Sequence, residues 1–221
     1  MKTRESGIPD EEMWAGFFNP EQILQKLGLI SATGDMVEFG CGYGTFTIPA
    51  ARIVTSTVYA IDIEAEMVSI AARKARQAGL DNVRTLLRDF VAEGTGLASG
   101  SVDYVMLFNI LHTEHPELLL NEASRILIPN GRLAIIHWNY DATTPRGPSM
   151  EIRPRPEQCR AWAEAAGFKL QPPGLIALPP YHYGFLLNKQ LVKEGDVLRQ
   201  SKGQGRKNSL IQLFSTNATS P

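Results

Sequence analysis

The sequence has only two cysteines, no long apolar run and almost no net charge, and each of these absences excludes a class of protein. Cys41 and Cys159 lie far apart without Cys-x-x-Cys spacing, which indicates neither a disulfide framework nor a zinc site. No apolar run approaches the roughly 18 residues that cross a bilayer, and the N-terminal stretch MKTRESGIPDEE lacks the apolar core of a signal peptide. The net charge of -1 gives no electrostatic reason to expect nucleic acid or an anionic membrane as a partner. We therefore expect a soluble, cytoplasmic protein without a metal site.

What the sequence does contain is a regular alternation of strand-like and helix-like segments. The strand-like segments are apolar and rich in β-branched residues, and they cover residues 35–39, 57–61, 83–87, 102–108 and 132–138. Helical spacing of apolar residues is found between them or after them, at 64–78, 116–127 and 156–167. Strands that are apolar throughout suit a parallel sheet that is covered on both faces. The order of the segments predicts an α/β fold with a doubly wound, mostly parallel sheet.

Proline marks the connections in the last third of the chain. Eight of the fourteen prolines fall between Pro145 and Pro180. They predict a long connection of restricted backbone at 139–155, and long loops in compact domains are commonly functional or disordered. Beyond the last helix, residues 168–178 and 181–187 are predicted to form two further strands.

A glycine-rich turn follows the first predicted strand in the sequence VEFGCGYGTF, residues 37–46. Gly40, Gly42 and Gly44 allow backbone amides to face a ligand where a side chain would clash. The carboxyl ends of the strands are the expected binding crevice of such a sheet. Thr45 stands where the dinucleotide fingerprint requires its third glycine, and no phosphate-binding GxxxxGK[ST] element is present. A tight turn without any ligand is the alternative interpretation.

Acidic residues follow three successive strands beside this turn. Glu38 lies within the apolar first strand, where an unpaired carboxylate would be costly, so it needs a cation or hydrogen-bond donors as partners. Asp62 closes the second strand and can accept both hydroxyls of a ribose. Asp89 follows the third strand, where its carboxylate can accept a hydrogen bond from an adenine amino group. Each could be a solvated loop acid, but their common position favours a nucleoside site.

Five stretches together resemble the class I S-adenosylmethionine-dependent methyltransferases: VEFGCGYGTF, VYAIDIEAEMVSIA, RDF, VDYVMLFNILH and ASRILIPNGRLAIIHW. The resemblance is closest to the small-molecule branch that includes the ubiquinone and menaquinone biosynthesis type, and it covers roughly residues 18–188. It implies a Rossmann-like sheet of seven strands whose last strand is antiparallel, and S-adenosylmethionine as the cofactor. It also implies a methyltransferase domain at 20–188, between an N-terminal lid or extension (1–19) and a basic C-terminal extension (189–221).

The resemblance further implies which residues hold the cofactor. They are Glu38, Gly40, Cys41, Gly42 and Gly44 around the methionine half, Asp62 at the ribose, Ile63 and Met67 beside the adenine, Asp89 and Phe90 at the adenine edge, and the backbone of Asn109 or Ile110 near the amino-acid end.

Three histidines are the candidates that could face the methyl acceptor. Methyl transfer is an in-line displacement that depends chiefly on positioning, and some methyltransferases also use a general base. His112 follows the fourth strand, His137 closes the fifth, and His182 begins the last strand, which the resemblance places beside the fifth. We expect His137 and His182 to be an acceptor-facing pair. The alternatives are that His112 and His115 cap the following helix and that His137 belongs to the core.

The acceptor itself is expected to be a small molecule. Residues 109–112 (Asn-Ile-Leu-His) are not an Asn-Pro-Pro-Tyr motif, which argues against methylation of an exocyclic base amine. A lipophilic acceptor such as a quinone is compatible with the proline-rich 139–155 loop and with the aromatic residues Trp14, Phe17 and Phe18, which could instead pack on the sheet edge. Two other classes stay open: a catalytically silent cofactor-binding module and, less favoured, a nicotinamide-dependent oxidoreductase. The oligomeric state is not predicted.

Overall fold

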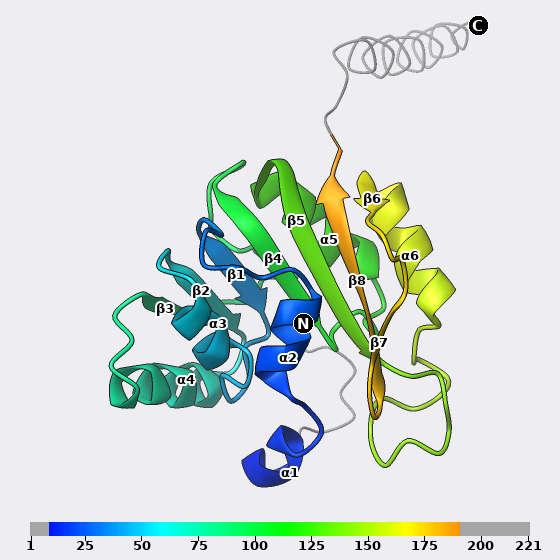
Figure 1. Ribbon diagram of the computed structural model, residues 1–221, viewed down its shortest axis with the longest axis horizontal. Helices are drawn as coiled ribbons and strands as arrows, with labels where there is room; N and C mark the ends of the chain where they lie inside the picture. The colour runs from blue at the N-terminus through cyan, green and yellow to red at the C-terminus, as the bar shows by residue number, and fades with distance from the viewer. Residues whose placement is uncertain (1–8, 191–221) are drawn as a thin grey trace, which may run out of the picture. The chain divides into compact units, whose positions relative to one another are not determined.

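The computed structural model describes residues 9–190, which form a mixed β-sheet with helices on both of its faces (Figure 1). The strands are β1 (Met36–Phe39), β2 (Val58–Asp62), β3 (Val83–Leu87), β4 (Val102–Phe108), β5 (Leu127–Trp138), β6 (Phe168–Leu170), β7 (Ile176–Leu178) and β8 (His182–Lys189). The helices are α1 (Glu11–Ala15), α2 (Pro20–Lys26), α3 (Thr47–Ile53), α4 (Ala65–Gln77), α5 (Pro116–Ile126) and α6 (Pro156–Ala165). The strand order is β3-β2-β1-β4-β5-β8-β6, and β7 pairs with β8. The doubly wound α/β fold predicted from the sequence is confirmed.

The direction of the strands reverses at β8. The strands from β3 to β5 are parallel, whereas β8 runs antiparallel to β5, as predicted for the last strand. Among the described residues the sheet has eight strands instead of the expected seven, because the predicted strand 168–178 is divided into β6 and β7. The five residues between them read QPPGL, and proline cannot donate to a strand ladder. The predicted basic extension 189–221 lies outside the described residues from residue 191 onward.

Successive residues of each strand point to opposite faces of the sheet, and each face has its own core. Ile135 of β5 packs in the core beneath α5 and α6, whereas Ile136 packs in the core beneath α2 and α3. The same alternation puts His137 on the α5–α6 face and Trp138 on the α2–α3 face. This alternation decides which side chains can reach a site at the end of the strand.

The first three helices were not predicted, although two of them carry recognisable start signals. The side chain of Asp10 accepts a hydrogen bond from the N–H of Met13 at the start of α1 (3.0 Å), and Asn19 does so for Gln22 at the start of α2 (3.3 Å). Pro20 occupies the first turn of α2, which tolerates proline. Within residues 9–190, no helix has the length and apolar composition that crossing a bilayer requires.

The N-terminal segment 9–19 is fastened to the glycine turn and to α4. The hydroxyl of Tyr43 donates to the carbonyl oxygen of Pro9 (3.1 Å). Lys74 of α4 forms an ion pair with Glu11 and donates to the carbonyl oxygen of Tyr43 (2.7 Å). These contacts hold α1 at the end of the sheet where the parallel strands finish (Figure 1).

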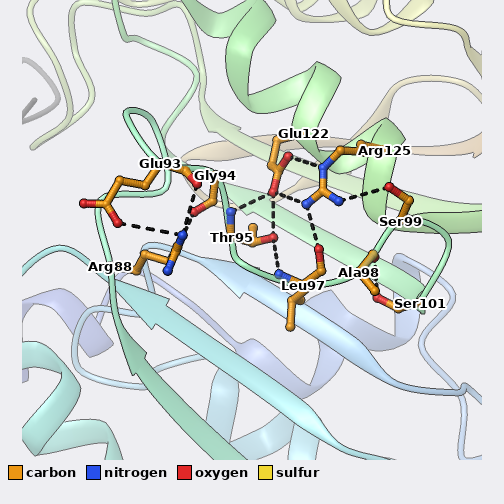
Figure 2. A network of polar contacts seen from close by, with 10 residues as sticks. All are labelled: Arg88, Glu93, Gly94, Thr95, Leu97, Ala98, Ser99, Ser101, Glu122 and Arg125. Atoms are coloured by element: carbon orange, nitrogen blue, oxygen red, sulfur yellow. Dashed lines mark hydrogen bonds and ion pairs between the residues drawn. The ribbon is translucent and has the colours of Figure 1, made fainter.

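A network of polar contacts ties the loop between β3 and β4 to α5 (Figure 2). Glu122 accepts hydrogen bonds from the backbone N–H and the hydroxyl of Thr95, both at 2.6 Å, and pairs with Arg125 at 2.7 Å. Arg125 in turn donates to the carbonyl oxygen of Leu97 (2.8 Å). Burial raises the pKa of Glu122, but the hydrogen bonds from Arg125 and Thr95 outweigh it and hold the pKa at about 2.

The same loop is closed on itself at its start. Arg88 donates through Nε to the carbonyl oxygen of Gly94 (2.6 Å) and through a terminal nitrogen to that of Glu93 (3.2 Å; Figure 2). Asp89 and Phe90 lie inside this closed turn. These hydrogen bonds hold the turn that carries Asp89 and Phe90.

Candidate functional site

A cavity opens at the carboxyl ends of the parallel strands, beside the glycine turn. Within the described residues its walls are formed by Trp14, Glu38, Gly40, Cys41, Gly42, Tyr43, Thr45, Phe46, Asp62, Ile63, Glu64, Asp89, Phe90, Val91, Phe108, Asn109, Ile110, His112, Trp138 and Pro148. Ten of the twelve residues predicted to hold a cofactor are among them. The two that are not among them are Gly44 and Met67.

The glycine turn presents backbone to this cavity. Gly40 and Cys41 both donate to the carbonyl oxygen of Ile61, at 2.8 and 3.0 Å, which anchors the turn to β2. Gly42 has a φ of 50°, and no atom lies within 4 Å of the position that a Cβ would take. The backbone at Gly42 is therefore open, and a side chain there would be strained by its conformation and would fill the space.

Glu38 is buried beneath the turn. It is 2% exposed, and its carboxyl group accepts a hydrogen bond from the hydroxyl of Thr47 at the start of α3. Burial raises the pKa of Glu38 to about 8, with a smaller contribution from the nearby negative charge of Asp62. The described residues place no lysine or arginine in an ion pair with Glu38. A positively charged ligand group at this position would supply the partner that the fold does not.

The two other predicted acids line the cavity further along the sheet. Asp62 accepts hydrogen bonds from the N–H of Gly42 (2.9 Å) and of Glu64 (3.0 Å), one at each carboxylate oxygen. Burial raises the pKa of Asp62, and the two backbone hydrogen bonds oppose this rise. Asp89 accepts from the N–H groups of Val91 and Ala92 at 3.1 and 3.0 Å. Glu38, Asp62 and Asp89 thus follow the strand order β1, β2, β3 across one half of the cavity.

Gly44 and Met67 are the two predicted cofactor residues outside the cavity wall. A Cβ at Gly44 would lie 3.5 Å from the Cβ of Ala71, which is an ordinary contact, so the φ of 75°, and not crowding, favours glycine at this position. Met67 of α4 is buried, at 7% exposed. Their contact with a cofactor stays a prediction.

The other half of the cavity, at the ends of β4 and β5, is aromatic. Phe108 packs against Phe46 with ring centroids 4.8 Å apart, and Trp138 lies 6.5 Å from Trp14 of α1. Asn109, which follows β4, has a φ of 57° and is 9% exposed. Neither the amide nitrogen nor the amide oxygen of its side chain has a hydrogen-bond partner in the described structure. Buried polar atoms without a partner are uncommon and need an explanation.

Of the three predicted histidines, His112 and His137 lie side by side, with ring centroids 5.5 Å apart, but only His112 lines the cavity. His112 lines the cavity, whereas His137 and His182 are buried, at 0% and 2% exposed, and do not. In the register of β5 and β8, His137 pairs with Tyr183 and Trp138 pairs with His182. Paired residues share a face and neighbours alternate, so His137 and His182 point to opposite faces. The structure therefore does not place His137 and His182 together in the cavity wall, as the predicted pair would require.

Both buried histidines are surrounded by rings. His182 lies 4.3 Å from Trp138 and 4.5 Å from Phe18, and burial lowers its pKa to about 3. Burial likewise holds the pKa of His137 well below its ordinary value, with a smaller effect from His112, whose ring lies 5.5 Å away. Both are neutral near pH 7, as core histidines are. The proposed capping role of His115 is not seen either, since its side chain does not cap α5.

The 139–155 connection reaches the cavity at one point, Pro148. The guanidinium of Arg153 holds this loop by donating to backbone oxygens, among them those of Pro148 (2.8 Å), Asn139 (3.1 Å) and Asp141 (2.9 Å). Arg153 is 7% exposed, so the loop is built around a buried cation that backbone carbonyls satisfy. This arrangement fixes the place of Pro148 in the wall.

Several wall residues were missed by the sequence prediction. Tyr43, Thr45 and Phe46 belong to the glycine turn itself and Glu64 follows Asp62, so proximity to recognised residues was an available signal. Trp14 was considered as a lid or as packing, and it is both a wall residue and part of an aromatic cluster with Phe18 (5.0 Å). The same signal was available for Val91, which follows Phe90, and for Phe108, which precedes Asn109. Pro148 lies in the predicted 139–155 loop, but nothing in the sequence singles it out within that loop.

The remaining chemistry of the cavity is limited. Cys41 lies in its wall and is 4% exposed; burial raises the pKa of its thiol, so it is a small buried side chain and not a reactive thiolate. Within residues 9–190 no three histidine, cysteine or acidic side chains are grouped so as to hold a metal ion.

Known proteins match this chain over the part that carries the cavity. Residues 37–135 match the family described as "Methyltransferase domain". The crystal structure of a SAM dependent methyltransferase from Aquifex aeolicus is 26% identical in sequence, with a TM-score of 0.72, and the match covers 81% of this chain and 94% of that chain.

Two curated relatives match shorter stretches. Aklanonic acid methyltransferase DauC from Streptomyces sp. (strain C5) is 33% identical over 116 residues, which are 51% of this chain and 52% of the relative. A probable cobalt-precorrin-6B C(15)-methyltransferase (decarboxylating) from Pyrobaculum aerophilum is 38% identical over 104 residues, 41% of this chain and 48% of the relative. This chain spans between 33% and 52% of the length of the first five curated relatives, and the acceptors in these two names differ.

Proposed function

We propose that this chain, whose residues 37–135 form a class I S-adenosylmethionine-dependent methyltransferase domain, transfers the methyl group of that cofactor to a small organic acceptor. S-adenosylmethionine is the cofactor of the domain. The observation that carries the proposed activity is the buried Glu38 beneath an open glycine turn, with Asp62 beside it.

The residues of the cavity fit this cofactor. Glu38 is a buried carboxyl group without a cationic partner among the described residues, and the cofactor has an ammonium group at its amino-acid end. Asp62 already accepts backbone N–H bonds through both oxygens and keeps further lone pairs for ribose hydroxyls. Bound in this way, S-adenosylmethionine supplies a methyl group on a positively charged sulfur.

The chain's own residues then bind the cofactor, orient it and exclude water. Glu38, Asp62 and Asp89 hold the two ends of the cofactor, and the aromatic rings at the ends of β4 and β5 exclude water from the reacting atoms. We assign His112 the task of taking a proton from the acceptor at a ring nitrogen, because it is the predicted histidine that lines the cavity. We also assign the N-terminal segment the role of a lid, because Trp14 closes one side of the wall.

Calorimetric titration of the purified protein tests cofactor binding. S-adenosylmethionine and S-adenosylhomocysteine are expected to bind with one site per chain, and NADH is not. Asp62→Ala should weaken the binding of both adenosyl ligands at least about tenfold, which corresponds to about 1.4 kcal/mol of binding free energy. Asp81→Ala, an exposed aspartate in the turn before β3, is the matched control and should bind both normally. Binding of NADH with no binding of the adenosyl ligands would instead support an oxidoreductase.

Turnover separates an enzyme from a silent binding module. The protein is incubated with methyl-labelled S-adenosylmethionine and a library of small hydroxylated, aminated and carbonyl compounds. Labelled product in at least one reaction, lost in Asp62→Ala, supports methyl transfer. Binding without any labelled product across the library would favour the silent module.

The type of acceptor is part of the proposal. The aromatic half of the cavity suits a lipophilic molecule, as does the resemblance of the glycine turn and strand motifs to the quinone-methylating branch. Quinone precursors therefore belong in the first library tested.

A further inference from the structure

The cavity is divided by charge along the strand order of the sheet. Its acidic wall residues belong to one half: Glu38 is in β1, Asp62 and Glu64 are at the end of β2, and Asp89 follows β3. At the ends of β4 and β5, on the other side of β1, no acidic residue lines the wall in the described part of the chain. No lysine or arginine lines either half in residues 9–190. A carboxylate or phosphate on the acceptor would thus find no partner there.

Flat apolar surfaces line the uncharged half. Phe46, Phe108 and Trp138 are each less than 9% exposed, yet all three reach the cavity wall. Phe18 continues the cluster behind them, 5.2 Å from Phe46 and 6.5 Å from Trp138. Trp14 of α1 lies at the same side, 6.5 Å from Trp138. Stacked and edge-to-face contacts with such rings favour a planar ring over an aliphatic chain.

The polar side chains of this half are the amide of Asn109 and the imidazole of His112. Asn109 has a left-handed backbone at φ 57°, and both atoms of its amide lack a partner in the described structure. An unsatisfied buried amide destabilises the protein, and the penalty disappears if a ligand supplies the hydrogen bonds. Once the side chain turns its buried amide toward the cavity, a hydroxyl group can serve either atom, by donating to the amide oxygen or by accepting from the amide nitrogen.

We propose that the β4–β5 half of the cavity is a subsite for an uncharged, hydroxyl-bearing aromatic acceptor, with Asn109 as the residue that orients the hydroxyl group. This inference rests on the proposed function, since it treats the β1–β3 half as the place of the cofactor. It names the chemical class of the acceptor, which the proposed function leaves open.

Calorimetry with three probes that share one naphthalene ring system tests the class. The probes are 2-naphthol, 2-naphthoate and 2-naphthylmethylammonium, which carry no charge, a negative charge and a positive charge at neutral pH. The full-length protein is first titrated with S-adenosylhomocysteine and then, saturated with it, with each probe. We expect 2-naphthol to bind one site, at least about tenfold more tightly than either charged probe.

Variants identify the residues that form the subsite. Asn109→Gly tolerates the positive φ and should weaken the binding of 2-naphthol about tenfold more than it weakens the binding of S-adenosylhomocysteine. Asn130→Gly is the matched control, since Asn130 has a φ of 62° but is exposed and distant from the cavity wall, and it should bind normally. Trp14→Ala should also weaken 2-naphthol, whereas Met13→Ala, a half-exposed neighbour on α1, should not.

The outcomes separate this inference from the proposed function. Equal or tighter binding of either charged probe overturns the uncharged class, and unchanged 2-naphthol binding in a folded Asn109→Gly overturns the role of Asn109. If Asn109→Gly does not fold, the probe series still tests the uncharged class and Trp14→Ala still tests the place of the subsite. Loss of S-adenosylhomocysteine binding in the wild-type protein overturns the proposed function, and the probes are then titrated into ligand-free protein, where the same comparison stands.

Discussion

Replacing Glu38 by glutamine is expected to stabilise the ligand-free protein, and to do so only at neutral and alkaline pH. Burial raises the pKa of Glu38 from 4.5 to about 8, so the folded state keeps a proton that the unfolded state releases. Between these two values the unfolded state binds fewer protons, and the free energy of unfolding therefore falls as the pH rises. Below pH 4.5 the carboxyl group is neutral in both states and the effect disappears.

The size of the effect follows from the gap between the two pKa values. At about 1.4 kcal/mol for each pH unit, burying the ionised carboxyl group costs up to about 5 kcal/mol once the pH exceeds 8. This is a large part of the 5 to 15 kcal/mol that typically stabilises a domain. Glutamine has nearly the same shape, stays neutral and can still accept the hydrogen bond from Thr47. It avoids the penalty at every pH.

Urea unfolding of dialysed, ligand-free protein at about pH 5, 7 and 9 measures this dependence. The difference in unfolding free energy between Glu38→Gln and wild type should be small at the lowest pH and grow to several kcal/mol at the highest. Glu21→Gln, at an exposed glutamate of α2, controls for the general effect of removing a charge. A difference that does not change with pH would refute the reasoning. The Glu38→Gln variant should also bind S-adenosylmethionine more weakly, because the ammonium group of the cofactor loses a charged partner.

Three further predictions concern the loop between β3 and β4, the loop after β5 and the two cysteines. Glu122→Ala leaves the N–H of Thr95 without its acceptor and should lower the free energy of unfolding by about 1 to 3 kcal/mol, measured in urea near pH 7. Because the folded pKa of Glu122 is about 2, this difference should fade as the pH drops below 4.5, and a constant difference would contradict it. Arg153→Met leaves the loop carbonyls unpaired and should speed proteolysis of the loop after β5. An unchanged rate of cleavage would contradict this prediction. Cys41 and Cys159 should react with a thiol reagent only after unfolding, since burial raises both thiol pKa values; rapid labelling of the folded protein would disprove this.

The cofactor half of the cavity could be predicted from the sequence because its residues follow directly from strand ends. Glu38, Asp62 and Asp89 each sit at a position that the apolar pattern of a strand defines, and parallel strands bring such positions to one edge. The glycine turn was found in the same way. Local sequence order was sufficient here, because the parallel topology supplied the missing spatial information.

The acceptor half could not be predicted in this way, since it depends on register and on long connections. Neighbouring residues of β5 point to opposite faces of the sheet, so Trp138 lines the cavity and His137 does not. Pro148 arrives through a loop whose shape is set by hydrogen bonds from Arg153 to backbone carbonyls, which leave no periodic pattern in the sequence. Trp14 is brought from before the first strand by contacts such as that between Tyr43 and Pro9.

The separation of charged and aromatic residues between the two halves of the cavity has an evolutionary consequence. The carboxylates that we propose to hold the cofactor come from β1, β2 and the end of β3, whereas most of the aromatic rings that we propose to meet the acceptor come from β4, β5 and the N-terminal segment. Mutations at Phe46, Phe108 or Trp138 can therefore alter acceptor preference while leaving the carboxylates of β1 to β3 intact. Duplicated copies of such a gene can diverge toward new acceptors without first losing the cofactor. A laboratory library confined to the aromatic half explores the same route.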